Sequence, residues 1–167
     1  FVKAHSEAPA FDARVRLLCD TGVSDIRSFD IDGDGKLDVV VTNYSSTSVS
    51  VFRNTATSGT INSSSFATRV DFSTGTNPNG LCVADFDGDS KPDIAVANYG
   101  SNTISIFRNT ASSGTINSGS FATKVDFATA TNPQSIAAAD ISGDGKVDIA
   151  VTNYGSNSVS VFQNNLE

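Results

Sequence analysis

The chain has 167 residues, of which 38% are hydrophobic, a size and composition that suit one globular domain and exclude a disordered chain. Its formal net charge of −7 argues against a nucleic-acid partner, because such partners require clustered Lys and Arg. No run approaches the roughly twenty apolar residues of a membrane-spanning helix, so no membrane insertion is expected.

The first 29 residues precede the repeated part of the sequence. We expect residues 1–10, which include the only histidine, His5, to be a solvated N-terminal extension. No signal-like region opens the chain, as expected of a mature or excised product. Residues 11–17 (FDARVRL) align, at an offset of 55, with a later strand that begins at Phe66. Residues 11–29 are therefore predicted to supply a donated outer strand followed by the first inner strand.

An acidic motif, D-x-[DS]-G-D-x-K-x-D, occurs three times at an interval of 55 residues. A tight loop can turn alternate carboxylates inward, and calcium prefers six to eight oxygen ligands at roughly 2.3–2.6 Å. The motif therefore predicts three calcium sites, with the seventh residue of each loop contributing its main-chain carbonyl. The predicted metal ligands are Asp30, Asp32, Asp34, Lys36 and Asp38; Asp85, Asp87, Asp89, Lys91 and Asp93; and Asp140, Ser142, Asp144, Lys146 and Asp148.

The motif is distinct from an EF-hand, which places a bidentate Glu at position twelve between two helices. Position twelve is Val41, Val96 or Val151 here, and β-branched runs flank each loop. The loops hold eleven of the eighteen acidic residues, so three divalent ions would add +6 to the charge and leave about −1. The alternative is that these aspartates form ordinary solvated turns, but their threefold repetition in register argues against it. We expect the ions to hold the loops together.

The repeat extends beyond the acidic loop, since residues 52–78 match residues 107–133 at 22 of 27 positions. One unit is predicted to contain strands at 81–86, 94–99, 103–107 and 121–127. Four short antiparallel strands per unit, with no helical periodicity, predict an all-β fold of propeller blades. The three predicted repeats are 30–84, 85–139 and the truncated 140–167, which lacks its outer strand.

The pattern of apolar residues predicts how each unit is buried. The second strand, Val39–Val41, is apolar throughout and is expected to be packed on both sides. The third strand alternates Ser and Val over 48–51, which predicts one wet and one buried face. Six phenylalanines that recur at 55 are expected to fill the space between blades: Phe52, Phe66, Phe72, Phe107, Phe121 and Phe127. Cys19 and Cys82 occupy different repeat positions, so a disulfide and two free thiols both stay open. The glycosylation sequons at Asn43 and Asn62 are expected by chance in so Ser-rich a chain.

With the acidic loops and the strands that follow them, residues 11–167 resemble FG-GAP/VCBS repeats, the blades of integrin-α-like propellers. The resemblance implies an extracellular or surface module that binds calcium between its first two strands and serves adhesion, ligand recognition or structure. The Phe-Gly and Gly-Ala-Pro signatures are not present as such, which favours the bacterial-type VCBS branch. Ser90 replaces a loop glycine, and Ser142 replaces a carboxylate. The third site is therefore predicted to be the weakest.

Three blades are fewer than the four to eight of most propellers, and the termini carry one spare strand and one missing strand. Two chains could exchange N-terminal strands and close a six-bladed ring with two-fold symmetry. Each chain could instead donate its strand to the next and form a filament. In the third reading, the chain is a piece of a longer array. The expected partners are therefore other copies of this chain, or a glycan or protein ligand.

The leading functional hypothesis is a non-enzymatic, secreted or cell-surface calcium-binding module with a structural or adhesive role. Weak all-oxygen calcium loops are filled at extracellular calcium levels, and one histidine in a tail cannot supply a catalytic triad. The alternative is a calcium-dependent lectin that uses one Tyr and one Asn per blade: Asn43 and Tyr44, Asn98 and Tyr99, and Asn153 and Tyr154. A third hypothesis is an enzyme that uses bound calcium, such as a polysaccharide lyase or a phosphodiesterase.

Overall fold

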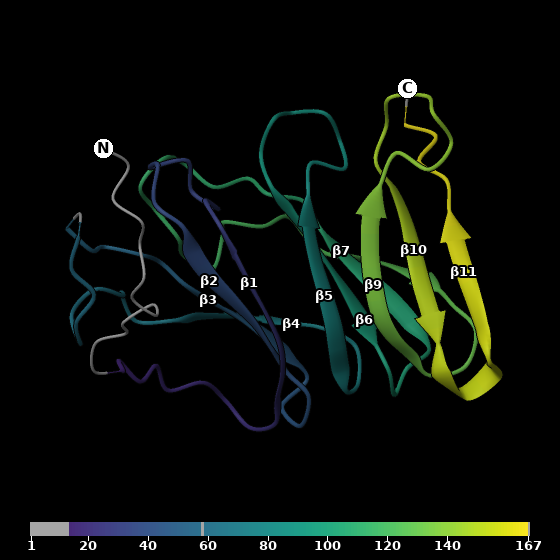
Figure 1. Cartoon of the computed structure of the whole chain (residues 1–167), viewed down its shortest axis with the longest axis horizontal. Helices are drawn as coiled ribbons and strands as arrows, with labels where there is room; N and C mark the ends of the chain where they lie inside the picture. Colours follow the sequence, from purple (N-terminus) through teal and green to yellow (C-terminus); the bar gives the residue numbers. More distant parts are fainter. Residues whose placement is uncertain (1–13, 58, 167) are drawn as a thin grey trace, which may run out of the picture.

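The computed structural model, which describes residues 14–57 and 59–166, is all-β in those residues apart from one short 3₁₀ turn. Three antiparallel sheets lie side by side (Figure 1). The first contains β1 (Val23–Phe29), β2 (Asp38–Asn43), β3 (Ser48–Phe52) and β4 (Val70–Ser73). The second contains β5 (Pro78–Ala84), β6 (Asp93–Asn98), β7 (Thr103–Phe107) and β8 (Val125–Ala128). The third contains β9 (Pro133–Ala139), β10 (Asp148–Asn153) and β11 (Ser158–Phe162), with the 3₁₀ turn at Tyr154–Ser156.

Each sheet is a meander in which consecutive strands are hydrogen-bonded neighbours. The acidic loop connects the first two strands of every sheet, and a tight turn connects the second and third. That turn places Thr47, Asn102 or Asn157 at φ between 50° and 55°, a left-handed conformation that Asn tolerates better than most residues. The predicted all-β, blade-like architecture is therefore confirmed, and each acidic loop lies within a sheet.

The inner strands join the three sheets. β5 lies between β1 and β9, and the Leu81 N–H donates to Asp25 Oδ2 at 2.9 Å across the first of these contacts. Gly80 permits the second, because a Cβ there would lie 2.6 Å from the carbonyl oxygen of Gln134. The three sheets therefore meet along their inner strands.

Two apolar clusters lie between the sheets. The first includes Val49, Val51, Phe72, Leu81, Ile94, Phe107 and Phe121, which come from the first and second sheets. The second includes Cys82, Ala95, Ile104, Ile136, Ile149 and Val151, from the second and third sheets. Five of the six repeated phenylalanines are buried or half-buried as expected, but Phe127 is 46% exposed.

The wet face predicted for the third strand is wrong, because all five residues of β3 are buried. The hydroxyl of Ser50 accepts from Asn43 Nδ2 at 2.8 Å and donates to Asp71 Oδ1 at 2.5 Å. Ser105 repeats both bonds in the second sheet. In the first two sheets, the alternating third strand therefore has both faces largely buried, one of them joined by polar bonds to the outer strand.

The third sheet has three strands in the described part of the chain. Residues 14–20 form no strand, so the strand predicted over 11–17 is not seen in residues 14–17, while residues 1–13 lie outside the described part. The Leu18 carbonyl instead accepts from Arg69 Nη1 at 2.8 Å, on the side of the first sheet.

Cys19 and Cys82 are both free thiols, and burial raises the pKa of Cys82 to about 12. The described residues include no helix that is long and apolar enough to span a membrane.

Candidate metal centre

The three acidic loops share one backbone conformation. The fourth residue of each, Gly33, Gly88 or Gly143, has φ between 66° and 80°. The sixth residue is also left-handed, and here Ser90, at φ 67°, stands where the other two loops carry glycine. A non-glycine residue in this conformation costs roughly 1–2 kcal/mol, so the loop geometry imposes itself on the second repeat despite the substitution.

In the first loop, carboxylate oxygens of Asp30, Asp32 and Asp38 lie within 4.8 Å of one another. Backbone N–H groups turn these side chains inward: Asp30 accepts from Asp34 at 3.1 Å and from Gly35 at 2.9 Å. Asp32 and Asp38 are buried. Three converging carboxylates can hold one hard cation.

In the second loop, the corresponding group of three is Asp85, Asp87 and Asp89, again within 4.8 Å. Asp85 accepts from Gly88 at 2.7 Å and from Ser90 at 2.8 Å, which orients its carboxylate as in the first loop. The first and second loops therefore both present a group that could hold a metal ion, although the third member differs between them.

In the third loop, the described residues include no group of three carboxylates at this distance. Asp140 still accepts from Gly143 at 2.7 Å and from Gly145 at 2.9 Å, so the loop keeps its fold. The calcium site predicted at this loop, with its ligands Ser142, Asp144 and Lys146, stays a prediction. In all three loops the backbone N–H of the lysine donates to the aspartate two residues earlier.

The ninth residue of each loop also has a structural function. Both oxygens of Asp38 accept backbone N–H groups, from Ile31 at 3.0 Å and from Asn54 at 2.8 Å. Asp93 and Asp148 repeat this pattern with Asn109 and Asn164. This carboxylate therefore fastens the loop to the end of the third strand, a function that its place in the motif did not reveal.

The electrostatic surroundings of this ninth residue change along the chain. Burial raises the pKa of Asp38 to about 6 and also raises the pKa of Asp93. The pKa of Asp148 is lowered, chiefly by the backbone hydrogen bond from Asn164. Asp148 is as buried as Asp38 and Asp93, so at this residue the hydrogen bonds outweigh the effect of burial. A bound cation would favour the ionised form of all three.

Arginine side chains at the first two loops were missed by the sequence reasoning. Arg53 Nε donates to Asp32 Oδ2 at 2.6 Å, and Arg53 Nη2 donates to Asp34 Oδ2 at 3.0 Å. Arg108 approaches Asp87 more loosely, at 3.9 Å. The third repeat has Gln163 at this position and Ser142 in place of the paired aspartate.

The third repeat lacks both the aspartate and the arginine of this pair, so its loop keeps the same net charge as the others. Four Asp, one Lys and one Arg give −2 in each of the first two loops, and three Asp with one Lys also give −2 in the third. The missing carboxylate of Ser142 is thus matched by a missing arginine. The recurring Arg-Asn pair after the third strand, replaced by Gln163-Asn164, was the signal available in the sequence.

The acidic loops also contact the next sheet. Asn109 Nδ2 donates to the Ile31 carbonyl of the first loop at 2.7 Å, and Asn164 Nδ2 donates to the Phe86 carbonyl of the second loop at 2.7 Å. Ser113 Oγ adds a bond to the Gly33 carbonyl at 3.1 Å. A cation in either of these loops would therefore order the contact between two sheets.

The amides of the lectin hypothesis are not available to a sugar. Asn43, Asn98 and Asn153 are all buried. Their Nδ2 groups donate to Ser and Thr hydroxyls of the following strand, such as Ser50 for Asn43 and Ser105 for Asn98. The structure contradicts this half of the proposed glycan site, since the amides hold each hairpin together.

The comparison with protein-family models identifies the repeat. An FG-GAP-like repeat model matches residues 30–96 and again residues 85–151, together more than half of the chain. No curated protein matches. Among solved structures, the crystal structure of BBS1N in complex with ARL6DN, soaked with lead, is similar at 12% identity with a TM-score of 0.41. That alignment covers 87% of this chain, which spans only 58% of the solved one. With its repeated acidic loops and β-propeller-like sheets, the chain belongs to the FG-GAP-like repeat family.

Proposed function

We propose that the chain is a non-enzymatic, extracellular calcium-binding repeat module with a structural or adhesive role. The observation that carries the proposal is the convergence of three carboxylates within 4.8 Å in each of two loops. Each loop carries a formal charge of −2, which a divalent cation neutralises. All-oxygen donors of this kind suit a hard cation such as Ca²⁺.

The proposed role of the ion is to stabilise the contacts between sheets. The first loop accepts hydrogen bonds from Asn109 and Ser113 of the second sheet, so ordering the loop also orders this interface. Binding to the folded chain alone would stabilise it by about 2.7 kcal/mol at a free calcium concentration of 100 Kd. A stabilising ion of modest affinity suits an extracellular setting, where calcium is abundant. The module is further proposed to associate with other copies of itself.

Calcium removal tests the proposal. Thermal unfolding and isothermal titration calorimetry are measured on chelator-treated protein, with calcium and then magnesium added back. We expect calcium to raise the melting temperature by several degrees, because it relieves repulsion among the carboxylates of each loop. Asp30→Asn and Asp85→Asn, made separately and together, should each remove part of this shift.

Asp20→Asn is the matched control, since Asp20 is an acidic residue outside the loops that accepts from the Thr21 N–H through an oxygen that Asn retains. Its calcium response should equal that of the natural chain. An unchanged melting temperature after chelation, together with no calorimetric signal, would refute the calcium function.

A further inference from the structure

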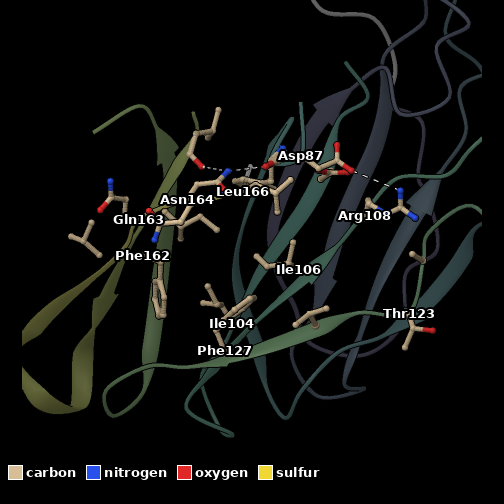
Figure 2. Close-up of a pocket in the computed structure, with 18 residues that line it drawn as sticks. Asp87, Ile104, Ile106, Arg108, Thr123, Phe127, Phe162, Gln163, Asn164 and Leu166 are labelled. Carbon is tan, nitrogen blue, oxygen red and sulfur yellow. Dashed lines mark hydrogen bonds and ion pairs between the residues drawn. The ribbon is translucent and has the colours of Figure 1, made fainter. Parts of the chain in front are cut away.

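An apolar cleft of about 810 Å³ lies between the second and third sheets. Figure 2 shows Phe162 on one side of it and Phe127, Ile104 and Ile106 on the other. Ile149 and Val161 complete its apolar lining. Phe127 and Val161 are 46% and 58% exposed, so apolar surface faces solvent here. An exposed apolar hollow of this size indicates a binding surface.

The corresponding space between the first and second sheets is filled. Phe121 packs there with its ring 4.9 Å from that of Phe72 and 6.3 Å from that of Phe107, edge to face in both cases. In the cleft, the rings at the same two repeat positions, Phe127 and Phe162, lie 6.3 Å apart. These two rings are in contact with each other, and no third ring from the described residues pairs with either of them, so the cleft lacks the counterpart of Phe121.

A strand is missing from the same place. In the second sheet, β8 pairs with β7 so that Val125 opposes Ile106 and Phe127 opposes Ile104. In the described residues, β11 pairs only with β10, and its outer edge has no partner. An unpaired edge beside an apolar cleft can accept an extended segment that supplies both main-chain hydrogen bonds and a side-chain anchor.

The chain itself contains a segment with the required pattern. Residues 11–17 align with residues 121–127 at an offset of 110, which places Phe11, Val15 and Leu17 at the positions of Phe121, Val125 and Phe127. In the structure, Val15 and Leu17 are half-buried, whereas Arg14 and Arg16 are exposed. This alternation is that of a strand with one apolar face.

We propose that residues 11–17 of a second copy of this chain insert into the cleft, with Phe11 packed against the Phe127 and Phe162 pair. Pairing in the register of the second sheet places Val15 opposite Val161 and Leu17 opposite Val159. The inference rests on the self-association included in the proposed function, and it identifies the segment and the cleft that would perform it.

The geometry favours a second copy over the same chain. Residues 14–20 lie beside the first sheet, through the bond between Arg69 and the Leu18 carbonyl, whereas β11 lies at the opposite end of the row of sheets (Figure 1). The exposed faces at the two ends also match. Ile26 on β1 is 57% exposed although its counterpart Leu81 is fully buried, and Val159 on β11 is 62% exposed although its counterpart Ile104 is buried.

These two faces would meet in the same event. The inserted segment continues into β1, as β4 continues into β5 at the first interface. Docking of residues 11–17 therefore brings the first sheet of one copy against the third sheet of the other. The contact is head to tail, and it closes a ring if two copies exchange segments or extends as a filament if they do not.

A cross-link tests the register. Val15→Cys and Val161→Cys are combined in a Cys19→Ser background, where the remaining Cys82 is buried. Oxidation of a mixture of isotopically light and heavy chains should yield a 15-to-161 disulfide between a light and a heavy chain. The control is each variant that carries only one of the two introduced cysteines, and it should give no such product. A disulfide within one chain, or no disulfide, would overturn the proposal.

Solution mass tests the anchor. Light scattering should give at least twice 17.3 kDa for the natural chain, and Phe11→Asp should reduce it to the mass of one chain. Phe1→Asp lies in the same tail outside the aligned segment and should leave the mass unchanged. A natural chain that is monomeric would overturn the inference.

Calcium titration of Phe11→Asp separates the two proposals. Retained calcium binding by a monomeric variant is expected, because each group of converging carboxylates comes from one loop and includes no residue of the inserted segment. If the cross-link forms but no calcium binds, strand exchange stands and the calcium function falls.

Discussion

The two interfaces between sheets are built from the same repeat, yet one is closed and the other is open. At the first interface, Phe121 and Phe72 are buried, and Asn109 and Ser113 bond to the first acidic loop. At the second, Asn164 makes the equivalent loop bond, but Phe127 is 46% exposed. The polar contact and an inner apolar cluster therefore form at both interfaces, but the outer aromatic packing forms only at the first.

This difference separates two functions within the repeat. The strands up to the third, with the Asn that follows it, attach each sheet to the acidic loop of the previous sheet. The later segment, which holds Phe121 and β8, supplies the aromatic ring and the outer strand. A sheet without that later segment keeps its fold and its loop, but it leaves an apolar cleft that another chain can fill.

The largest expected effect comes from removing the ring that closes the first interface. Phe121→Ala should lower the free energy of unfolding by about 3–5 kcal/mol, since it creates a cavity among Phe72 and Phe107. Urea unfolding followed by circular dichroism measures it. Phe127→Ala is the control and should cost only about 1 kcal/mol, because its side chain is half exposed.

Both variants belong in the Phe11→Asp background, so that association does not cover the cleft. Equal losses from the two substitutions would mean that the second interface is as closed as the first, contrary to the structure.

The sequence predicted much of this architecture because the 55-residue repeat set the register of every strand and loop. The β-branched strands and the acidic motif fixed the fold class and the position of each loop. Burial of Ser50 and Ser105 was not predicted, because alternation between Ser and Val is typical of a strand with one wet face. Here hydrogen bonds with Asn43 and Asp71 satisfy the Ser50 hydroxyl, so that it can be buried.

The candidate site was predicted less completely than the fold. The motif identified the carboxylates that converge, but it could not assign Asp38 and Asp93 their bonds to backbone N–H groups beyond the third strand. Nor could it place Arg53 against Asp32, since these residues are 21 positions apart. Such contacts depend on how the strand ends return to the loop, which the spacing within the motif does not encode.

A smaller effect is expected from the polar contact between sheets. Asn109→Ala should destabilise the chain by about 2–3 kcal/mol, because it removes bonds to the Ile31 and Pro92 carbonyls and leaves buried groups unpaired. Asn54→Ala is the matched control, since Asn54 bonds to the Leu37 carbonyl but to no neighbouring sheet.

The difference between the two variants, measured by urea unfolding, should be about 1 kcal/mol and should report the bond between sheets together with the deeper burial of Asn109. Identical losses would show that this bond contributes nothing to the interface.

The smallest expected effect concerns one methyl group at the turn beside the third sheet. In the second repeat, the Gly75 N–H donates to Asn98 Oδ1 at 3.0 Å, and a Cβ on Gly75 would lie 2.8 Å from Asn98 Cγ. Ala130 stands at the equivalent position of the third repeat, where the buried Asn153 Oδ1 has no donor among the residues that the structure describes.

Ala130→Gly should therefore let the backbone approach and satisfy Asn153 Oδ1. Pairing a buried acceptor gains about 1–3 kcal/mol, while glycine costs about 0.5–1 kcal/mol in backbone entropy, so a net gain of about 1 kcal/mol is expected in urea unfolding. The reverse substitution, Gly75→Ala, should destabilise the second repeat. A loss of stability from Ala130→Gly would show that the methyl group is not what separates this residue from Asn153, and that the two repeats differ here for another reason.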